Sequence, residues 1–282
     1  MSKPNQVSKK TQKKIAIIND LSGYGRCSLT VALPVISAMG IQACPVPTSI
    51  LSNHTAYPVF FFDDYTDKMP AYISKWKELG LCFDGILTGF LGSDAQIDIV
   101  ESFIHDFPQA RVIIDPIMGD HGKTYSTFTP RLCDRMKQLV THADVLTPNL
   151  TEACILTGTT YRSHFSGKEL AALLEKLSGL CPGEIVISGV DAGAYLANIL
   201  FDPKQEADSR ITCLRKKRIA AERCGTGDIF SAIIAAGTVQ GMPLQACVAK
   251  AAGFVSRCLK ETAGYELSSS DGVVFEPLLK YL

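Results

Sequence analysis

Residues 14–47 read KIAIINDLSGYGRCSLTVALPVISAMGIQACPVP, and this stretch indicates how the chain is built. Its apolar pattern predicts a strand, a helix closed by a glycine, and a second strand, at residues 14–19, 28–39 and 41–47. The first strand is a β-branched run typical of a parallel strand buried on both faces. The turn after it has Gly23 and Gly25 but no third glycine, so the dinucleotide-binding fingerprint is absent. The chain therefore begins as a β-loop-α-β unit.

The same alternation continues along the rest of the chain. Further strands are predicted at residues 85–88, 111–115, 145–146 and 184–188, and helices at 67–80, 94–107, 130–141, 150–157 and 167–180. Two antiparallel strands at 193–201 and 210–218 precede two apolar helices at 228–239 and 243–259. Such alternation predicts a three-layer α/β/α fold, with a mainly parallel central sheet, helices on both faces, and ligands at the carboxyl ends of the strands.

No repeat and no linker divides the chain. Residues 1–13 are polar and basic and predict a disordered tail, whereas residues 14–282 predict a single domain. Residues 48–64, TSILSNHTAYPVFFFDD, combine polar and aromatic side chains and predict a loop or small β-flap near a ligand. Residues 262–282 are expected to end in a surface helix.

Two features of the flap segment have an ordinary structural interpretation. His54 taken alone is more often a structural hydrogen-bonding residue than a catalytic one. The aromatic run Phe60–Phe62 is interpreted as part of the core or of an interface, in preference to a stacking platform.

The composition narrows the class of protein. The 28 basic and 28 acidic residues among 282 give a formal net charge of zero, which argues against nucleic acid as the main partner. No apolar run of about twenty residues and no signal-peptide hydrophobic region is present, so neither membrane insertion nor secretion is expected. The ten cysteines include no C-x-x-C pair, which suggests neither a zinc site nor a disulfide framework and fits a reducing cytoplasm. Cys44, Cys82 and Cys154 lie among apolar residues and are interpreted as small buried hydrophobes.

The motif Cys224-Gly225-Thr226-Gly227-Asp228 opens an alanine-rich predicted helix. A helix N-terminus presents unpaired N–H groups and partial positive charge, so this turn could hold a phosphate during its transfer. Asp228 in the first turn could accept a proton from an attacking hydroxyl group. Taken alone, the motif is more often an ordinary helix cap. The other motifs of the chain determine which of the two interpretations is favoured.

Three other motifs fall at predicted strand ends. They are Asp115-Pro116-Ile117-Met118-Gly119-Asp120, Thr147-Pro148-Asn149-Leu150-Thr151-Glu152, and Ile185-Val186-Ile187-Ser188-Gly189. Each also has a plain interpretation, as a turn, a capping box and a strand end. Together, before a helix that can bind an anion, they favour a nucleotide site, with oxygen ligands that suit Mg²⁺.

The motifs D-P-I-M-G-D, T-P-N-L-T-E and C-G-T-G-D, with the early Ser52-Asn53-His54-Thr55, resemble the vitamin-kinase branch of the ribokinase-like superfamily, and most closely the pyridoxal kinases. The resemblance covers roughly residues 14–259. G-T-G-D occurs across the superfamily, whereas S-N-H-T in the flap is more characteristic of pyridoxal kinases. The implied activity is ATP-dependent phosphorylation of a B6 vitamer, for the salvage of pyridoxal phosphate.

The resemblance implies roles for the matching residues. Asp228 would be the base that deprotonates the 5′-hydroxymethyl group of pyridoxal, pyridoxine or pyridoxamine. The backbone of Gly225, Thr226 and Gly227 would form the anion hole.

The resemblance also implies metal and nucleotide sites. Asp120 and Glu152 would organise Mg²⁺ around the ATP phosphates, with Asn149 close by. Asp115 and Thr147 match positions near a monovalent-cation site, for example for K⁺, that some members use. Ser188, Gly189 and Thr226 match the nucleotide region, and Tyr125 matches a position on the loop that closes over ATP. A homodimer is expected from the resemblance alone.

Three residues would line the vitamin pocket, namely Asn19, Thr55 and Phe90. Two of them depart from the family pattern, because many pyridoxal kinases have serine at the position of Asn19 and tyrosine at that of Phe90. Both departures bear on the choice of vitamer and leave phosphoryl transfer intact. A hydroxymethylpyrimidine kinase of thiamine synthesis is the alternative with the same chemistry. A ligand-binding protein on a retired kinase fold is the alternative without catalysis, although such a protein would have little reason to keep Asp228.

Overall fold

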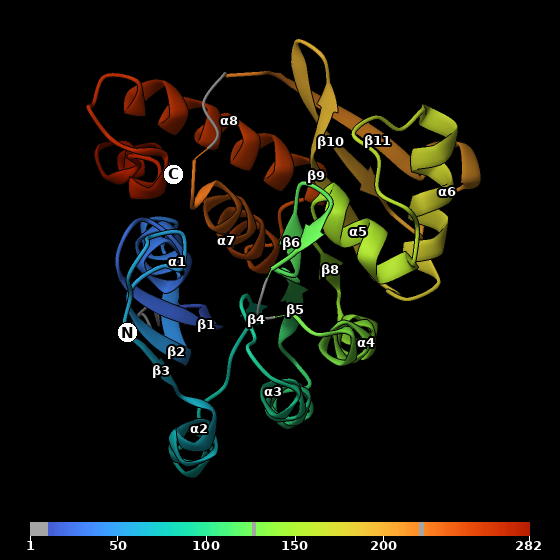
Figure 1. Cartoon of the computed structure of the whole chain (residues 1–282). Helices are drawn as coiled ribbons and strands as arrows, with labels where there is room; N and C mark the ends of the chain where they lie inside the picture. The colour runs from blue at the N-terminus through green and yellow to red at the C-terminus, as the bar shows by residue number, and fades with distance from the viewer. Residues whose placement is uncertain (1–10, 126–127, 220–222) are drawn as a thin grey trace, which may run out of the picture.

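The computed structural model describes residues 11–125, 128–219 and 223–282, so most of the predicted tail lies outside the described residues. Within these ranges a nine-stranded sheet forms the centre of the molecule, in the order β11-β10-β9-β8-β5-β4-β1-β2-β3 (Figure 1). The strands are β1 (Lys14–Tyr24), β2 (Gln42–Asn53), β3 (Phe62–Asp64), β4 (Gly85–Thr88), β5 (Arg111–Ile114), β8 (Val145–Leu146), β9 (Glu184–Ala192), β10 (Tyr195–Phe201) and β11 (Ile211–Lys217). The six strands from β9 to β2 in this order run parallel, and β3, β10 and β11 join antiparallel at the two edges.

Helices cover both faces of the sheet, which confirms the predicted three-layer α/β/α class. One face carries α1 (Ser28–Ala38), α7 (Thr226–Val239) and α8 (Leu244–Thr262). The other carries α2 (Met69–Glu78), α3 (Asp94–Asp106), α4 (Pro130–Leu139), α5 (Leu150–Thr157) and α6 (Gly167–Ser178). Side chains of β1 alternate between the two layers, because Ile15 and Ile17 pack on the first face and Ala16 and Ile18 on the second.

The helix α7 is the most deeply buried of this set. Eleven of its residues are buried, from Ile229 to Val239 without interruption. A helix that is apolar all round has to be enclosed by other elements, and α7 is packed against α1, α8 and the sheet. The burial fixes the position of its first turn relative to the strand ends.

The first strand is longer than predicted. Residues 20–25 were expected to form a glycine-containing turn, but β1 continues through all but the last of them and pairs with β2 as far as Tyr24 and Asn53. The register of the β1–β2 pair shifts between Asn19 and Leu21. Beyond this shift β1 pairs with β2 alone, because its pairing with β4 ends at Ile18. Pairing with β2 supplies the backbone hydrogen bonds that a turn would otherwise have provided.

The structure bears on three expectations about exposure. The aromatic run at the predicted flap is not part of the core, because Phe60, Phe61 and Phe62 are 46%, 64% and 45% exposed, and of the two interpretations only the interface is left. Cys82 is exposed although its sequence neighbours are apolar. The C-terminal segment ends in a surface helix as expected, the 3-10 helix η5 (Glu276–Tyr281), but Val273, Val274 and Phe275, between η4 (Ser269–Asp271) and η5, are buried.

Candidate functional site

The carboxyl ends of the parallel strands bring the predicted motifs together. The Asp115 N–H donates to Thr88 O at 3.2 Å, and the Thr147 N–H donates to Ile114 O at 3.0 Å, which links the ends of β4, β5 and β8. An isolated bridge between Asn149 and Ser188 joins the residues that follow β8 to β9. Motifs that are more than 70 residues apart in the sequence therefore share one edge of the sheet.

The helix α7 begins at this edge and has an open N-terminus. Its N-cap, Gly225, has a φ of 81°, and no side chain caps the helix. Thr226 Oγ1 donates to Arg223 O at 3.2 Å instead, and Gly227 is exposed. The helices α5 and α6, by contrast, each begin with a complete capping box. Capping was the plain interpretation of the C-G-T-G-D motif, and Gly225 is the N-cap residue, but no side chain of the motif caps the helix N-terminus.

Only glycine fits at the N-cap of α7. A Cβ at Gly225 would lie 1.9 Å from the carbonyl oxygen of Arg26, and its left-handed φ disfavours any other residue. The turn is therefore held against the segment that precedes α1.

Asp228 lies in the first turn of α7, partly buried. Burial raises the pKa of its carboxyl group to about 7, against hydrogen bonds from the Ser28 backbone and the Asn19 side chain, which lower it. The nearby carboxylate of Asp20 adds to the increase in pKa. A carboxyl group with this pKa can both take up and release a proton near neutral pH.

Asn19 links Asp228 to the end of β4. Its Oδ1 accepts hydrogen bonds from the N–H groups of Asp20 and Phe90, at 2.9 and 2.8 Å. A Cβ at Gly89 would come within 2.3 Å of the Asn19 amide, so glycine is required there. Asn19 is buried, with 5% of its surface exposed. Phe90 is partly buried and packs against the core on the second face of the sheet.

A second group of carboxylates lies between β5 and α5. Glu152 closes the capping box of α5, where its Oε2 accepts from the Asn149 N–H at 2.8 Å and its Oε1 from the Met118 N–H at 3.0 Å. Burial raises the pKa of Glu152 to about 7, and it raises the pKa of Asp115 well above its usual range. The charges of Glu152 and Asp228 add to the increase at Asp115, so these three carboxyl groups act on one another.

The segment after Asp115 is strained. Ile117 has a φ of 38°, which is rare for a β-branched residue, and a short hairpin follows, made of β6 (Gly119–Asp120) and β7 (Lys123–Thr124). Asn149 Nδ2 donates to Gly119 O at 2.8 Å and anchors the hairpin. Asp120 stands exposed on it, and its Oδ1 accepts from the His121 N–H at 2.8 Å.

Of three other predicted site residues, two are exposed and one is buried. Tyr125 is 43% exposed, and its pKa is raised by the buried part of its ring and then by Glu152 and Asp120. Gly189 is exposed with a φ of 65°, and its N–H donates to Asn198 Oδ1 at 3.3 Å. Thr147 is buried, and its hydroxyl group donates to Ile114 O at 3.4 Å.

The flap is attached to the C-terminal segment. His54 is 8% exposed, and its Nε2 lies 2.7 Å from Ser270 O. The hydroxyl group of Tyr57 donates to Asp271 Oδ1 at 2.8 Å. Thr55, between them, is exposed in the turn that follows β2. His54 is thus hydrogen-bonded, as interpreted from the sequence, and the C-terminal residues that hold the flap were not foreseen.

Three functional candidates were missed from the sequence. Asp20 is buried beside Asp228 and accepts a hydrogen bond from Ser22 Oγ at 2.9 Å. Ser28, with a strained φ of 51°, directs its N–H to Asp228. Cys27 lies next to Cys224. The stretch D-L-S-G-Y-G-R-C-S contains all three candidates, but it was interpreted as a turn over residues 20–25 followed by the start of a helix at Ser28, and this local interpretation gave no sign of residues about 200 positions away.

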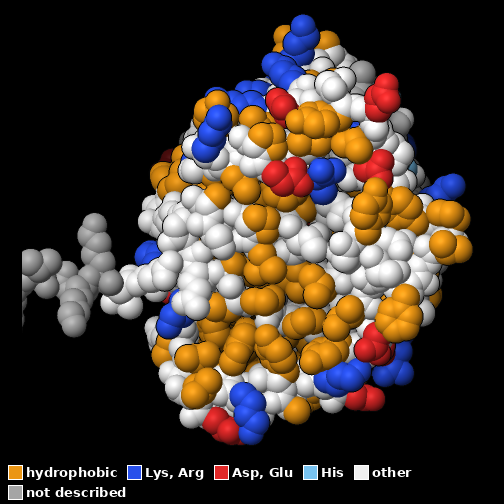
Figure 2. Space-filling model, turned by 90° about the vertical axis from the view of Figure 1, so that its left-hand side faces the viewer, with side chains coloured by type: hydrophobic (Ala, Val, Ile, Leu, Met, Phe, Trp, Pro, Cys, Tyr) orange, Lys and Arg blue, Asp and Glu red, His pale blue; other side chains and the backbone are white. Residues whose placement is uncertain are grey.

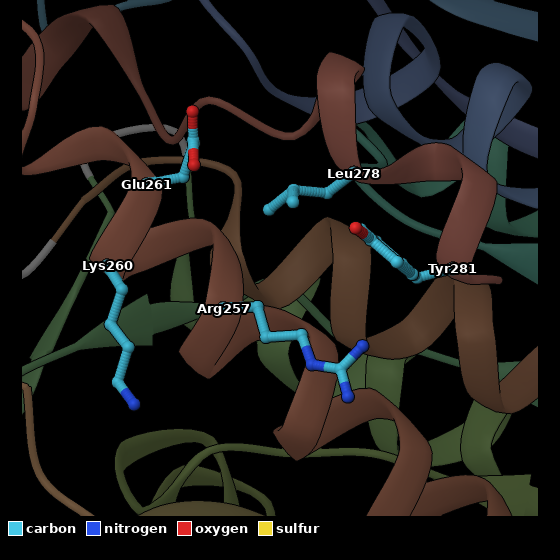
Figure 3. A pocket seen from close by; sticks show the side chains of 5 residues that line it. All are labelled: Arg257, Lys260, Glu261, Leu278 and Tyr281. Atoms are coloured by element: carbon cyan, nitrogen blue, oxygen red, sulfur yellow. The ribbon is translucent and has the colours of Figure 1, made fainter.

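Two shallow pockets lie apart from the predicted residues. Figure 3 shows one, lined by Arg257, Lys260 and Glu261 of α8 and by Leu278 and Tyr281 of η5. The other lies at the amino ends of β5 and β9, the opposite edge of the sheet, beside Arg111 and Glu184. Neither contains a predicted site residue.

An open helix N-terminus next to a buried carboxyl group with a raised pKa, on this fold, is the arrangement expected of an ATP-dependent small-molecule kinase of the ribokinase-like class. The sequence profile of phosphomethylpyrimidine kinase matches residues 33–274. The chain therefore belongs to the phosphomethylpyrimidine kinase family.

Pyridoxal kinases are among its relatives. That of Arabidopsis thaliana is 30% identical over 207 residues, which cover 71% of this chain and 65% of the plant protein, so the match spans just under two thirds of the latter. The crystal structure of the Lactobacillus plantarum pyridoxal kinase superposes with a TM-score of 0.89 at 29% identity, over 96% of both chains. A Bacteroides thetaiotaomicron protein, assigned as a phosphomethylpyrimidine kinase and crystallised with pyridoxal, gives a TM-score of 0.90 at 39% identity, over 96% of both chains.

Proposed function

We propose that this protein transfers the γ-phosphate of ATP to the 5′-hydroxymethyl group of a B6 vitamer, namely pyridoxal, pyridoxine or pyridoxamine. The observation that carries the proposal is the open N-terminus of α7 with Asp228, whose pKa is about 7, in its first turn. The bacterial relative crystallised with pyridoxal, 39% identical to this chain, supports the choice of acceptor.

Asp228 is the base of the proposed reaction. Its carboxylate accepts the proton of the acceptor hydroxyl group as the oxygen attacks phosphorus. The N–H groups of Gly225, Thr226 and Gly227 then face the negative charge of the phosphoryl group in transfer, and the α7 dipole adds to this stabilisation. No rearrangement is needed, because the burial of α7 holds these groups in place.

The carboxyl groups at the end of β5 fit Mg²⁺ by the chemistry of their donors. Asp115 and Glu152 carry hard oxygen ligands whose pKa values are raised partly by neighbouring carboxylates, so a cation would relieve their repulsion. Among the described residues, no three His, Cys, Asp or Glu side chains form a metal cage. Asp120 and Glu152 would hold the ion through water, and the ion would neutralise charge on the ATP phosphates. Asp115 and Thr147 are the proposed neighbours of a monovalent cation such as K⁺.

The other nucleotide-binding residues of the proposal are Asn149, Ser188, Gly189 and Tyr125. Asn149 follows β8, Tyr125 follows β7, and Ser188 and Gly189 lie within β9. The acceptor would lie on the other side of Asp228, towards Asn19, Phe90 and Thr55. In this proposal the donor and acceptor bind on opposite sides of the α7 N-terminus.

A homodimer formed through the flap is part of the proposal. Figure 2 views the side on which β1–β3 lie in Figure 1, and hydrophobic side chains gather across it. Those of the flap are among the most exposed, with Val59 at 78% and Phe61 at 64%. An apolar patch of this kind is typical of a protein–protein interface.

The proposed location is the cytoplasm. The ten cysteines are all free thiols, which suits a reducing compartment. None of the helices in the described part of the chain is long and apolar enough to cross a lipid bilayer.

Coupled detection of ADP with purified protein, ATP and Mg²⁺ tests the proposal. Turnover with at least one of the three B6 vitamers is expected, and its rate with and without K⁺ tests the monovalent site. Hydroxymethylpyrimidine, run in parallel, tests the alternative suggested by the family name. Turnover with that pyrimidine and none of the vitamers would overturn the assigned acceptor.

A further inference from the structure

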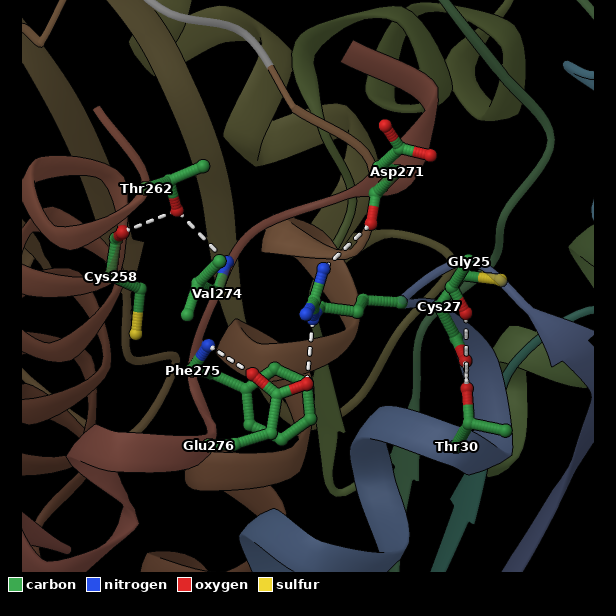
Figure 4. A network of polar contacts seen from close by, with 10 residues as sticks. Gly25, Cys27, Thr30, Cys258, Thr262, Asp271, Val274, Phe275 and Glu276 are labelled. Carbon is green, nitrogen blue, oxygen red and sulfur yellow. Dashed lines mark hydrogen bonds and ion pairs between the residues drawn. The ribbon is translucent and has the colours of Figure 1, made fainter. Parts of the chain in front are cut away.

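The turn before α7 is packed against the turn before α1 and the C-terminal segment. Gly225 is in contact with the Arg26 carbonyl oxygen, and the Cys224 N–H donates to Ser269 O at 3.5 Å. Arg26 is itself fixed, because its Nε pairs with Glu276 at 2.6 Å and its Nη1 donates to Asp271 O at 3.1 Å (Figure 4). Two segments almost 200 residues apart are thereby held side by side.

Two free thiols meet at this junction. The side chains of Cys27 and Cys224 are hydrogen-bonded to each other, and His54 is hydrogen-bonded to Cys224. Cys27 is 5% exposed, whereas Cys224 is only partly buried. One thiol of the pair is therefore enclosed and the other can be reached by a small solute.

The two thiols differ in acidity. The hydrogen bond from Cys27 and, after it, that from His54 lower the pKa of Cys224 to about 5, against the effect of burial. The same hydrogen bond, with burial, raises the pKa of Cys27 far above its ordinary value. Of the two thiols, Cys224 is therefore the more readily ionised and the more exposed. Reactive cysteines occupy such environments.

We propose that Cys224 and Cys27 form a peroxide-sensitive modification site, in which Cys224 is the thiol that is oxidised and Cys27 the thiol that resolves it as a disulfide. The site switches the kinase off reversibly, because it lies directly before the anion-binding turn.

The chemistry balances with hydrogen peroxide as the oxidant. The Cys224 thiolate attacks one peroxide oxygen, the O–O bond breaks, and the departing hydroxide takes a proton to leave as water, which yields a sulfenic acid. The sulfur of Cys27 then attacks the Cys224 sulfur, the S–O bond breaks, and the hydroxide leaves as a second water with the proton of Cys27. Two thiols lose two electrons and two protons, and one peroxide becomes two waters.

Closing the disulfide must move the anion-binding turn. A sulfur–sulfur bond of about 2.05 Å is shorter than any hydrogen bond between thiols, so Cys224 is drawn towards Cys27. Gly225 cannot follow freely, because it already touches Arg26. The N–H groups of residues 225–227 are therefore displaced, and a displacement of about 1 Å in a catalytic turn can cost on the order of 100-fold in rate.

Peptide mapping of the purified full chain after treatment with hydrogen peroxide tests the site. We expect a peptide pair linked through residues 27 and 224, and a loss of ATP-dependent turnover of at least roughly 10-fold that a dithiol reductant reverses. The mapping needs no substrate, so its failure is distinguishable from failure of the proposed kinase activity. Absence of the linked pair would overturn the proposal.

Three variants, each compared with its own untreated sample, sharpen the test. Cys224→Ser is expected to resist peroxide. Cys27→Ser is expected to lose activity that the reductant no longer restores, because an unresolved sulfenic acid is oxidised further. Cys213→Ser, which removes an exposed thiol on β11, is expected to respond as the wild type does. Inactivation that persists in Cys224→Ser, or full recovery in Cys27→Ser, would contradict the assigned roles.

Discussion

The side chain of Asn19 is hydrogen-bonded to the carboxylate of Asp228, while its Oδ1 accepts from the Phe90 N–H at 2.8 Å. One amide group thus connects the end of β1, the segment after β4 and the first turn of α7. Residues on the acceptor side of the proposed site are in this way coupled to the protonation of the proposed base.

Replacing Asn19 is therefore expected to change a pH profile. In Asn19→Ala the pKa of Asp228 rises above about 7, because a hydrogen bond that favours its charged form is lost. A bond of this kind corresponds to roughly one pKa unit. The acid limb of kcat/KM should move by that amount to higher pH. Asn198→Ala, which removes another buried amide, should leave the limb in place, and an unmoved limb in Asn19→Ala would refute the coupling.

Asp228→Asn tests the base and its cost to stability. Turnover should fall by about two to four orders of magnitude while ATP still binds. The folded-state pKa of about 7 exceeds the ordinary value of 3.8, so ionisation of Asp228 destabilises the fold increasingly from about pH 4 to pH 7. The variant should therefore have a higher Tm than the wild type at pH 8 and a similar Tm at pH 4. Thermal unfolding at both pH values checks this, and unchanged turnover would show that the base lies elsewhere.

Gly89→Ala should disturb the site through Asn19. The new Cβ would meet the Asn19 side chain at 2.3 Å, so the amide has to move and release Asp228 or Phe90. We expect a loss of about 1–3 kcal/mol in the free energy of unfolding and a reduced kcat. Gly167→Ala is the matched control, because a Cβ at Gly167 would meet no atom within 4 Å and its φ is ordinary. Denaturant titration of both variants measures the free energy of unfolding, and an equal loss in Gly89→Ala and Gly167→Ala would contradict the prediction.

Glu152→Gln should weaken both the fold and the response to Mg²⁺. The glutamine offers one acceptor oxygen where the carboxylate serves two backbone N–H groups, so one of these is left unpaired at a cost of about 1–3 kcal/mol. The Mg²⁺ concentration for half-maximal turnover should also rise. Glu169→Gln makes the same change in the exposed capping box of α6 and should alter neither quantity as much. Equal effects in the two variants would argue against a metal role.

Phe61→Asp tests the flap as an interface. A charge at this 64% exposed position is expected to shift the protein from dimer to monomer in light scattering coupled to size exclusion. Tyr195→Asp, at an exposed aromatic residue on β10, should leave the dimer intact. A monomeric wild type would refute the proposed dimer.

Two features could be predicted from the sequence, namely the three layers of the fold and the edge of the sheet at which the candidate site lies. Strand, helix and strand-end motifs repeat in residues 14–259, and each is a local pattern that neighbouring residues determine. The predicted anion-binding turn begins α7 as expected, because Gly225 and the apolar run after it are local signals.

What escaped prediction depends on contacts between distant residues. Most of the turn predicted at residues 20–25 became a strand because β2 pairs with it, and Asp20 and Cys27 lie beside Asp228 and Cys224 only in the folded chain. The apolar composition of the aromatic flap left core and interface both open, and its position beside β3 at the sheet edge leaves it exposed. The C-terminal segment carries no periodic signal, and Val273 to Phe275 are buried through tertiary packing alone.

The contacts of the C-terminal segment also bear on how the protein is made. Ser270, Asp271 and Glu276 hold His54, Tyr57 and Arg26, so residues that are synthesised at least 214 positions later secure the flap and the segment before α1. A chain that stops before Ser268 still encodes every strand of the sheet, the carboxylates and α7, but none of these anchors. Premature termination therefore removes the contacts that hold the acceptor side and leaves the elements of the nucleotide side in the chain. A fused protein has to leave the contacts of Ser270, Asp271 and Glu276 intact.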